Sequence, residues 1–236
     1  MKIIAHRGAS GYAPENTLAA LKKALLMNVD MIEFDVHALS SGEVILMHDH
    51  RLNRTTDGAG YVLDHDFVDL RRLNAGDNEV IPTLEEVLDL VNRQVPVDIE
   101  LKGPGSVAAV AAIITRYLER GWRPHDFLVS SFNHHELQEF KRLMPHIAVA
   151  ALLDAIPLGY AAFAEELQAV AVCPGHESIN QAYVTDAHNR GLEVYVWTVN
   201  DIEEVRRLQA LGVDGIFTNF PDMARRAINQ PNIKVE

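Results

Sequence analysis

The chain has 236 residues, of which 48% are hydrophobic, so it can bury one sizeable core. Barrels of about 200–250 residues often form a single domain. The formal net charge of −12 argues against binding of nucleic acid and against stable membrane association. If the protein binds a phosphate group, the binding site would have to be a local cationic pocket.

The single cysteine, Cys173, excludes an internal disulfide framework and a zinc-type cysteine cluster. The apolar stretches are too short for a membrane span, and the first residues are too short an apolar run for a signal peptide. A reducing, cytoplasmic setting is therefore expected.

Strand-like and helix-like segments alternate along the chain. In chain order we predict a strand at 2–5, a helix at 15–27, strands at 31–37 and 44–48, a helix from 82 to about 92, a strand at 95–101, a helix at 107–120, a strand at 127–131, a helix at 134–143, a strand at 147–152, a helix at 158–167, a strand at 169–173, a helix at 180–189, a strand at 193–197, a helix at 202–211, a strand at 215–217 and a helix at 221–228.

This order contains about eight strand-then-helix units and one additional strand at 44–48. Regular alternation with short connections indicates parallel strands covered by helices, and eight units in this length favour a closed (β/α)8 TIM barrel. The polar segment 51–80, rich in Gly and Asp, breaks the alternation. We interpret it as a small insertion after the second strand unit, between the second and third units, within a single domain at 1–236.

Two of the predicted strands carry acidic residues among apolar ones. Glu33 and Asp35 share one face of the strand 31–37, because side chains of a strand alternate. Glu100 lies near the C-terminal end of the strand 95–101, where barrel enzymes keep their chemistry. Paired acids on an edge strand are often merely solvated, but these strands are expected to be central. Three convergent carboxylates without a thiolate favour Mg²⁺ or Ca²⁺ over Zn²⁺.

Histidines and cations stand at the ends of the same strands. His6 and Arg7 close the first strand, His48 closes the additional strand beside Asp49, and Lys102 follows the strand that carries the third carboxylate. Paired histidines suit proton transfer, and an arginine grips phosphate oxygens at two points. The alternatives to a functional role are histidines whose hydrogen bonds are purely structural, an arginine at the surface and a lysine in an internal ion pair.

Several other residues carry weaker signals. Trp197 and Phe132 end two strands and either wall the pocket or pack at its rim. Glu15 and Asn16 are interpreted first as residues that stabilise the start of a helix, and a role in binding substrate is the second interpretation. Most of the remaining histidines, His37 among them, are expected to be solvated.

With these residues in view, the chain resembles a glycerophosphodiester phosphodiesterase of the small cytoplasmic bacterial kind. Each matching motif is weak alone, but the set occurs in family order over nearly the whole chain and is highly specific. The motifs are His6-Arg7-Gly8, Pro14-Glu15-Asn16-Thr17, Glu33-Phe34-Asp35-Val36, His48-Asp49, Leu52-Asn53-Arg54-Thr55-Thr56-Asp57-Gly58, Pro82-Thr83-Leu84, Glu100-Leu101-Lys102, Val196-Trp197-Thr198-Val199-Asn200 and Gly215-Ile216-Phe217-Thr218-Asn219-Phe220-Pro221.

The resemblance implies a (β/α)8 barrel and a divalent cation, Mg²⁺ or Ca²⁺. It also implies that the glycerol 2-hydroxyl attacks phosphorus and expels the alcohol, after which water opens the cyclic phosphate to sn-glycerol 3-phosphate. The substrates would be small molecules such as glycerophosphocholine or glycerophosphoethanolamine. The roles implied are metal ligands Glu33, Asp35 and Glu100, a general base and a general acid in His6 and His48, and phosphate contacts Arg7 and Lys102. Of the two histidines, His6 is favoured as the base and His48 as the acid. Trp197, from its place at the end of a strand, is taken as a further substrate contact.

Three alternatives stay open at this point. A lysophospholipase D would act on lipid, but the polar insertion 51–80 does not favour it. A non-catalytic phosphate-binding barrel would be expected to lack a histidine or a carboxylate of the site. A metal-dependent aldolase barrel does not match the ordered motifs. The preferred head group, the native metal, the oligomeric state and the division of base and acid between the two histidines are left undetermined, and a homo-oligomer is compatible with the sequence.

Overall fold

The structure, a computed structural model, describes residues 1–229, and residues 230–236 of the predicted domain lie outside the described residues. The strands are β1 (Lys2–Ala5), β2 (Met31–Ala38), β3 (Val44–Leu46), β4 (Val97–Leu101), β5 (Phe127–Ser131), β6 (Ala148–Leu153), β7 (Ala171–Pro174), β8 (Glu193–Val196) and β9 (Gly215–Thr218).

The helices are α1 (Leu18–Leu26), α2 (Phe67–Leu70), α3 (Leu84–Val91), α4 (Ser106–Glu119), α5 (His134–Leu143), α6 (Phe163–Glu166), α7 (Gln181–Asn189), α8 (Ile202–Leu211) and α9 (Pro221–Asn229). Three short 3₁₀ turns are η1 (Leu52–Arg54), η2 (Val62–Asp64) and η3 (Pro124–Asp126).

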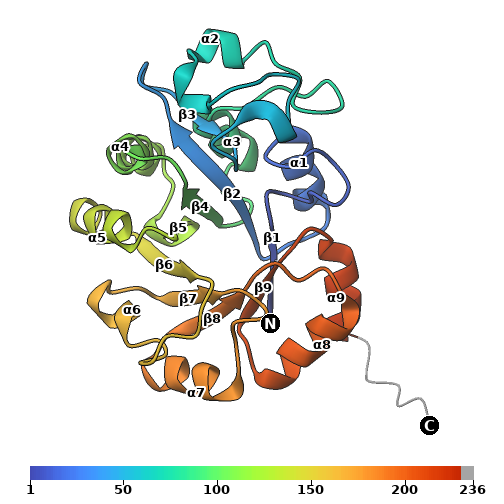
Figure 1. Cartoon of the computed structure of the whole chain (residues 1–236), viewed down its shortest axis with the longest axis vertical. Helices are drawn as coiled ribbons and strands as arrows, with labels where there is room; N and C mark the ends of the chain where they lie inside the picture. Colours follow the sequence, from blue (N-terminus) through green and yellow to red (C-terminus); the bar gives the residue numbers. More distant parts are fainter. Residues whose placement is uncertain (230–236) are drawn as a thin grey trace.

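Parallel strands close into a barrel that is surrounded by helices (Figure 1). The strand order around the barrel is β1-β9-β8-β7-β6-β5-β4-β2, and pairing of β1 with β2 closes the ring. The additional strand β3 runs antiparallel to the last part of β2. The predicted TIM barrel is therefore confirmed, with the C-terminal ends of its parallel strands meeting at one mouth.

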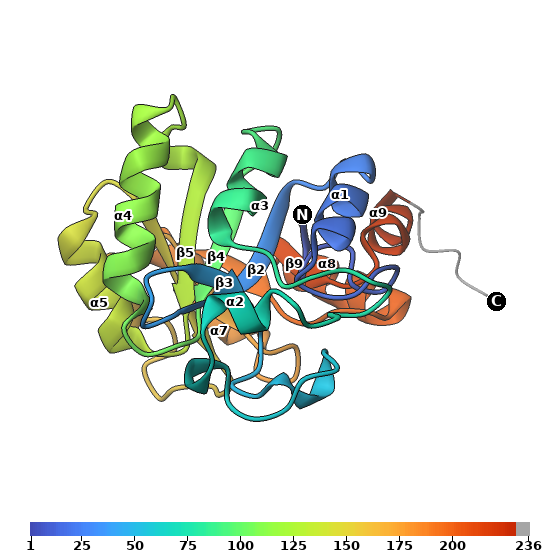
Figure 2. The same cartoon turned by 90° about the horizontal axis from the view of Figure 1, so that it is seen from above.

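The segment 51–80 departs from the alternation, as predicted, but its place differs slightly. It follows β3 and precedes α3, so it lies inside the second unit and not between the second and third. It holds η1, η2 and α2, and Figure 2 shows α2 and its neighbouring loops at one end of the barrel. Leu52, Val62 and Leu70 of this segment are buried in a small apolar cluster that also includes Ile45 and Met47.

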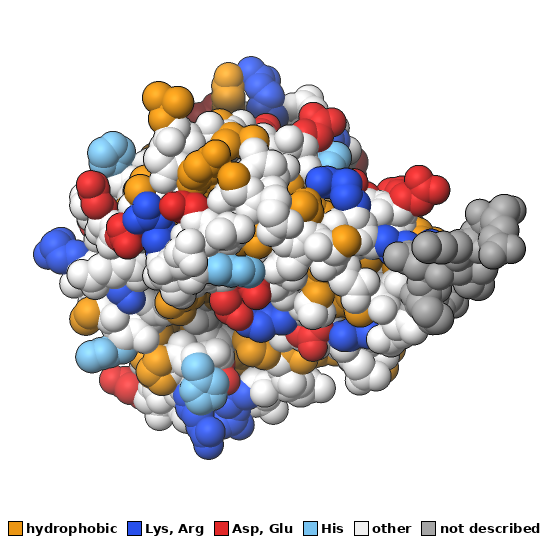
Figure 3. Space-filling model, turned by 90° about the horizontal axis from the view of Figure 1, so that it is seen from below, with side chains coloured by type: hydrophobic (Ala, Val, Ile, Leu, Met, Phe, Trp, Pro, Cys, Tyr) orange, Lys and Arg blue, Asp and Glu red, His pale blue; other side chains and the backbone are white. Residues whose placement is uncertain are grey.

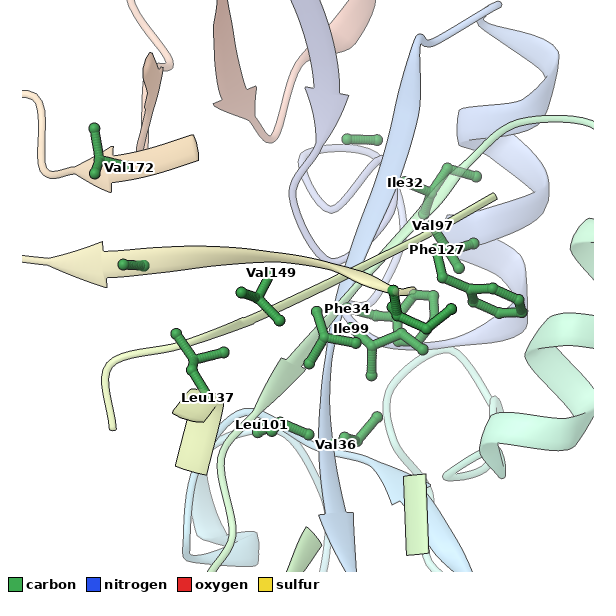
Figure 4. Close-up of a cluster of buried hydrophobic side chains, with 14 of the residues drawn as sticks. Ile32, Phe34, Val36, Val97, Ile99, Leu101, Phe127, Leu137, Val149 and Val172 are labelled. Carbon is green, nitrogen blue, oxygen red and sulfur yellow. The ribbon is translucent and has the colours of Figure 1, made fainter. Parts of the chain in front are cut away.

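The barrel interior receives the acidic residues of two neighbouring strands. β2 and β4 pair in parallel with Glu33 opposite Asp98 and Asp35 opposite Glu100. Register partners point to the same face of a sheet, so these carboxylates share the interior. The intervening residues are apolar and pack outward into the main core, drawn in Figure 4; they are Ile32, Phe34, Val36, Val97, Ile99 and Leu101.

Two predicted helices are shorter in the structure. α1 begins at Leu18 and not at residue 15, because Asn16 has a φ of 57° and Thr17 is an extended N-cap whose hydroxyl accepts from the Ala20 N–H. α6 covers only Phe163–Glu166 of the predicted helix 158–167. Tyr160 has a φ of 47°, and such a left-handed residue interrupts a right-handed helix.

Charges on the molecular surface are mixed. Figure 3 shows Lys and Arg side chains next to Asp and Glu side chains on one face. Within residues 1–229, no helix is long and apolar enough to cross a membrane.

Candidate active site

Three carboxylates meet inside the barrel near its mouth. One oxygen from each of Glu33, Asp35 and Glu100 lies within 4.8 Å of the others. The exposed fractions of these residues are only 2%, 0% and 7%. Three ionised carboxylates that are this close together and this deeply buried repel one another unless a bound cation neutralises their charge.

The electrostatics of this triad fit a bound cation. Burial, followed by the charges of Asp35 and Glu100, raises the pKa of Glu33 well above its usual value. Burial and the charge of Asp35 raise the pKa of Glu100 to about 8. Glu33 Oε1 and Asp35 Oδ1 are buried and have no hydrogen-bond partner within residues 1–229. An all-oxygen set with free lone pairs suits a hard ion such as Mg²⁺ or Ca²⁺.

Two cationic side chains border the triad. The guanidinium Nε of Arg7 lies 3.3 Å from Asp35 Oδ2, and the backbone N–H of the same residue donates to Glu33 Oε2 at 2.8 Å. Lys102 Nζ donates to Glu100 Oε1 at 2.8 Å and lies 3.8 Å from Asp35 Oδ1. A phosphate seated beside a metal on the triad would therefore be within reach of positive charge.

His6 is held by an amide. Its Nδ1 lies 2.7 Å from Asn219 Oδ1, and an amide oxygen can only accept, so Nδ1 carries the proton. The lone pair then resides on Nε2. Burial first, and the charge of Arg7 second, lower the pKa of His6 to about 4. This ring is neutral at pH 7 and can accept a proton.

His48 is held by a carboxylate. Its Nδ1 donates to Asp49 Oδ1 at 2.7 Å, and its Nε2 accepts from Lys102 Nζ at 3.2 Å, because an ammonium can only donate. Burial lowers the pKa of His48, while the charge of Asp35 and the hydrogen bond to Asp49 act in the opposite direction. The anionic partner at Nδ1 stabilises the imidazolium that a proton donor needs.

A cavity of about 250 Å³ opens beside these groups. Among the predicted site residues, His6, Arg7, Glu33, His48, Glu100 and Trp197 line it. Asp35 and Lys102 adjoin it through the ion pairs described above. Trp197 donates from Nε1 to the Cys173 carbonyl at 2.7 Å and meets Phe132 edge-on, with ring centroids 5.4 Å apart. The structure thus brings all the predicted residues to one place.

Two more residues join the site: Asn219, which was given no role from the sequence, and Asn16, which was interpreted first as stabilising a helix start and second as binding substrate. Asn219, within a matched motif after β9, holds His6. Asn16 grips Asp35 at two points: its Nδ2 donates to Oδ2 at 2.9 Å, and its Oδ1 accepts from the Asp35 N–H at 3.2 Å. Motif membership was the available signal, since neither amide has a distinctive spacing. His37 is fully buried, unlike the solvated histidines expected, because it follows Asp35 on the inward face of β2.

Comparison with known proteins adds a family match. The sequence model of the Glycerophosphoryl diester phosphodiesterase family matches residues 6–223. A glycerophosphodiester phosphodiesterase of Bacillus subtilis is 35% identical over 245 residues, covering 93% of this chain and 84% of that protein. Another, of Caldanaerobacter subterraneus, is 33% identical over 232 residues, covering 93% and 94%.

Solved structures show the same architecture. An Oleispira antarctica phosphodiesterase, solved in complex with the product sn-glycerol-3-phosphate, superposes with a TM-score of 0.90 at 32% identity. The match covers 98% of this chain and 97% of that one. A glycerophosphodiester phosphodiesterase from Agrobacterium tumefaciens gives a TM-score of 0.82 at 28% identity, covering 96% and 99%.

Proposed function

Because this chain belongs to the glycerophosphoryl diester phosphodiesterase family, we propose that it hydrolyses small glycerophosphodiesters to sn-glycerol 3-phosphate and an alcohol. The observation that carries the proposal is the meeting of two differently held histidines, two cations and a buried carboxylate triad at one cavity. The sn-glycerol-3-phosphate bound to the Oleispira antarctica protein supports the choice of product.

Glu33, Asp35 and Glu100 would hold a divalent cation, Mg²⁺ or Ca²⁺. When bound, such a cation supplies positive charge to the phosphate oxygens as negative charge develops there. Arg7 offers a guanidinium to the same oxygens, and Lys102 an ammonium. Trp197 would orient the bound substrate at the wall of the cavity.

The histidines divide the proton transfers. His6 Nε2, with its lone pair free, takes the proton of the glycerol 2-hydroxyl as that oxygen bonds to phosphorus. His48 delivers a proton to the oxygen of the departing alcohol, so that the bond between phosphorus and this oxygen breaks without leaving an alkoxide. The roles then reverse when water opens the cyclic phosphate: His48 takes a proton from the water, and His6 returns its proton to the 2-hydroxyl oxygen. Each positioned transfer contributes roughly 10²–10⁴-fold to the rate.

The setting of the enzyme belongs to the same proposal. We take residues 1–236 as one domain with a small-molecule substrate and a cytoplasmic location, supported by the continuous barrel and the lone cysteine. The polar insertion at the mouth favours water-soluble head groups.

A kinetic panel tests the proposal. Glycerophosphocholine, glycerophosphoethanolamine and glycerophosphoglycerol should be cleaved with kcat/KM values within about two orders of magnitude, because the site holds mainly phosphate and glycerol. Bis(p-nitrophenyl) phosphate lacks the attacking hydroxyl and should be a poor substrate. A strong preference for long-chain lysophosphatidylcholine would favour the lipid-directed alternative, and failure to release sn-glycerol 3-phosphate from every member would refute the proposed function.

A further inference from the structure

One arginine of the insertion reaches two carboxylates at the edge of the site. Arg54, in η1, donates from Nε and Nη2 to the two oxygens of Asp49, both at 2.8 Å. It also donates from Nη1 and Nη2 to the two oxygens of Glu15, again at 2.8 Å. The guanidinium therefore forms a two-point contact with each acid.

Each of these acids holds a residue of the proposed machinery. Asp49 Oδ1 accepts from His48 Nδ1 at 2.7 Å. Glu15 Oε1 accepts from Arg7 Nη1 at 2.8 Å. Arg54 is thus one side chain away from both the proposed proton donor and the proposed phosphate clamp.

The insertion is anchored where this contact occurs. Beyond Arg54, Glu79 Oε2 accepts from the Ala19 N–H at 3.2 Å, in the first turn of α1. Gly76 packs so closely on Pro14 that a Cβ there would lie 2.8 Å from Pro14 Cγ. The insertion therefore contacts the β1–α1 loop at two points and the start of α1 at a third, and Arg54 bridges two packed segments.

The contacts of Arg54 with Asp49 and Glu15 should be more stabilising than an ordinary ion pair at the surface. An isolated exposed ion pair contributes little, and the Arg54 side chain is 47% exposed. Here, however, one guanidinium is shared by two carboxylates in fork geometry. Burial alone would raise the pKa of Glu15, but the hydrogen bond from Arg54 and the charge of Arg7 lower it to about 2. Removing Arg54 would leave two acids without the cation that orients both.

We propose that Arg54 is a positioning residue that holds His48, through Asp49, and Arg7, through Glu15, in register for the reaction. The proposal rests on the proposed function of those two residues. It makes the insertion a part of the catalytic apparatus and not only a cover over the barrel mouth.

The test uses Arg54→Gln and Arg54→Lys in the full chain. Substrates are glycerophosphocholine, a poor leaving group, and glycerol p-nitrophenyl phosphate, a good one; inorganic phosphate serves as the inhibitor. Arg72→Gln is the matched control, because Arg72 is an exposed arginine of the same insertion with one pair at 3.4 Å, to Asp69.

The two routes predict separate changes. Through Asp49, Arg54→Gln should lower kcat for glycerophosphocholine about 10- to 100-fold, as is usual when a residue that orients a side chain of the site is lost. It should lower kcat for the p-nitrophenyl ester much less. Through Glu15, it should weaken inhibition by inorganic phosphate several-fold. Arg54→Lys should recover part of both, and Arg72→Gln should match the wild type.

Each outcome decides the matter. An equal loss on both esters that parallels a fall in Tm would mean a purely structural role and overturn the proposal. A change in only one readout would overturn the claim that Arg54 serves both groups. If the wild type cleaves the esters and Arg54→Gln behaves in the same way, this proposal alone is refuted. If the wild type cleaves neither ester, the proposed function on which it rests is refuted.

Discussion

At the scale of single residues, the two histidines differ in the partner that holds each ring. A neutral amide oxygen accepts from the Nδ1–H of His6, while a carboxylate accepts from the Nδ1–H of His48 and can balance an imidazolium. The difference lies in the neighbours, since the two rings are chemically identical. It supports His6 as the group that accepts the first proton and His48 as the group that gives one.

The histidine assignment makes a direct prediction. His6→Ala and His48→Ala should each lower kcat by at least about 10²-fold with little loss of Tm. The control, His188→Ala, removes an exposed histidine paired with Asp214 and should leave turnover unchanged. If His48→Ala kept near-normal turnover on glycerophosphocholine, its role as the acid would be wrong.

Glu15 should make stability depend on pH. Its pKa is about 2 in the folded protein and about 4.5 ordinarily, so as the pH falls through 4.5 the unfolded chain takes up the proton first. The stabilisation is present above pH 4.5 and is lost as the pH falls towards 2. Urea unfolding at pH 7, 4 and 3 should therefore show the gap between wild type and Glu15→Gln closing with acid. A gap independent of pH would contradict this.

At the scale of the element, the capped start of α3 is tied to the insertion. Thr83 and Glu86 form a capping box at α3: the Thr83 hydroxyl accepts from the Glu86 N–H at 3.2 Å, and Glu86 accepts from the Thr83 N–H at 2.9 Å. Glu86 also pairs with Arg71 of the insertion. The end of the insertion is thus tied to the start of a barrel helix.

Loss of this cap should weaken the fold without altering the chemistry. Thr83→Ala leaves the Glu86 N–H without its acceptor and should lower the free energy of unfolding by about 1 kcal/mol. Thr115→Ala is the control, since Thr115 lies within α4 and, among residues 1–229, its hydroxyl bonds only to the carbonyl one turn back and to a methionine sulfur. Denaturant melts compare the two. A large fall in kcat of folded Thr83→Ala would show that the cap also shapes the site.

At the scale of the whole molecule, the barrel separates two environments. Apolar residues of β2 and β4 face the helices, and their acidic neighbours face the interior. Burying three acids opposes folding unless charge is neutralised, and Arg7 and Lys102 do so only in part. A divalent cation would complete the balance.

Metal removal should therefore affect both activity and stability. A chelator should abolish turnover, and Mg²⁺ or Ca²⁺ should restore it and raise Tm; an ion at 100 times its Kd stabilises the fold by about 2.7 kcal/mol. Glu100→Gln should reduce the rise in Tm, because one ligand charge is gone. Full activity in the metal-free protein would refute the metal assignment.

What the sequence determined by itself follows from short-range geometry. Strand alternation alone placed Glu33 and Asp35 on one face, and eight strand-helix repeats predicted the barrel. The candidate residues could be chosen because each stands inside or at the end of such a strand, where its direction is set by the local backbone.

The tertiary structure decided which distant side chains meet. Asn219 reaches His6 across 213 positions, and Arg54 reaches Glu15 across 39, because barrel closure and the folded insertion bring them together. The left-handed Tyr160 shortened α6, and the inward face of β2 buried His37. A linear pattern encodes the face of a strand but not the partner across the barrel, since that partner depends on the path of the whole chain.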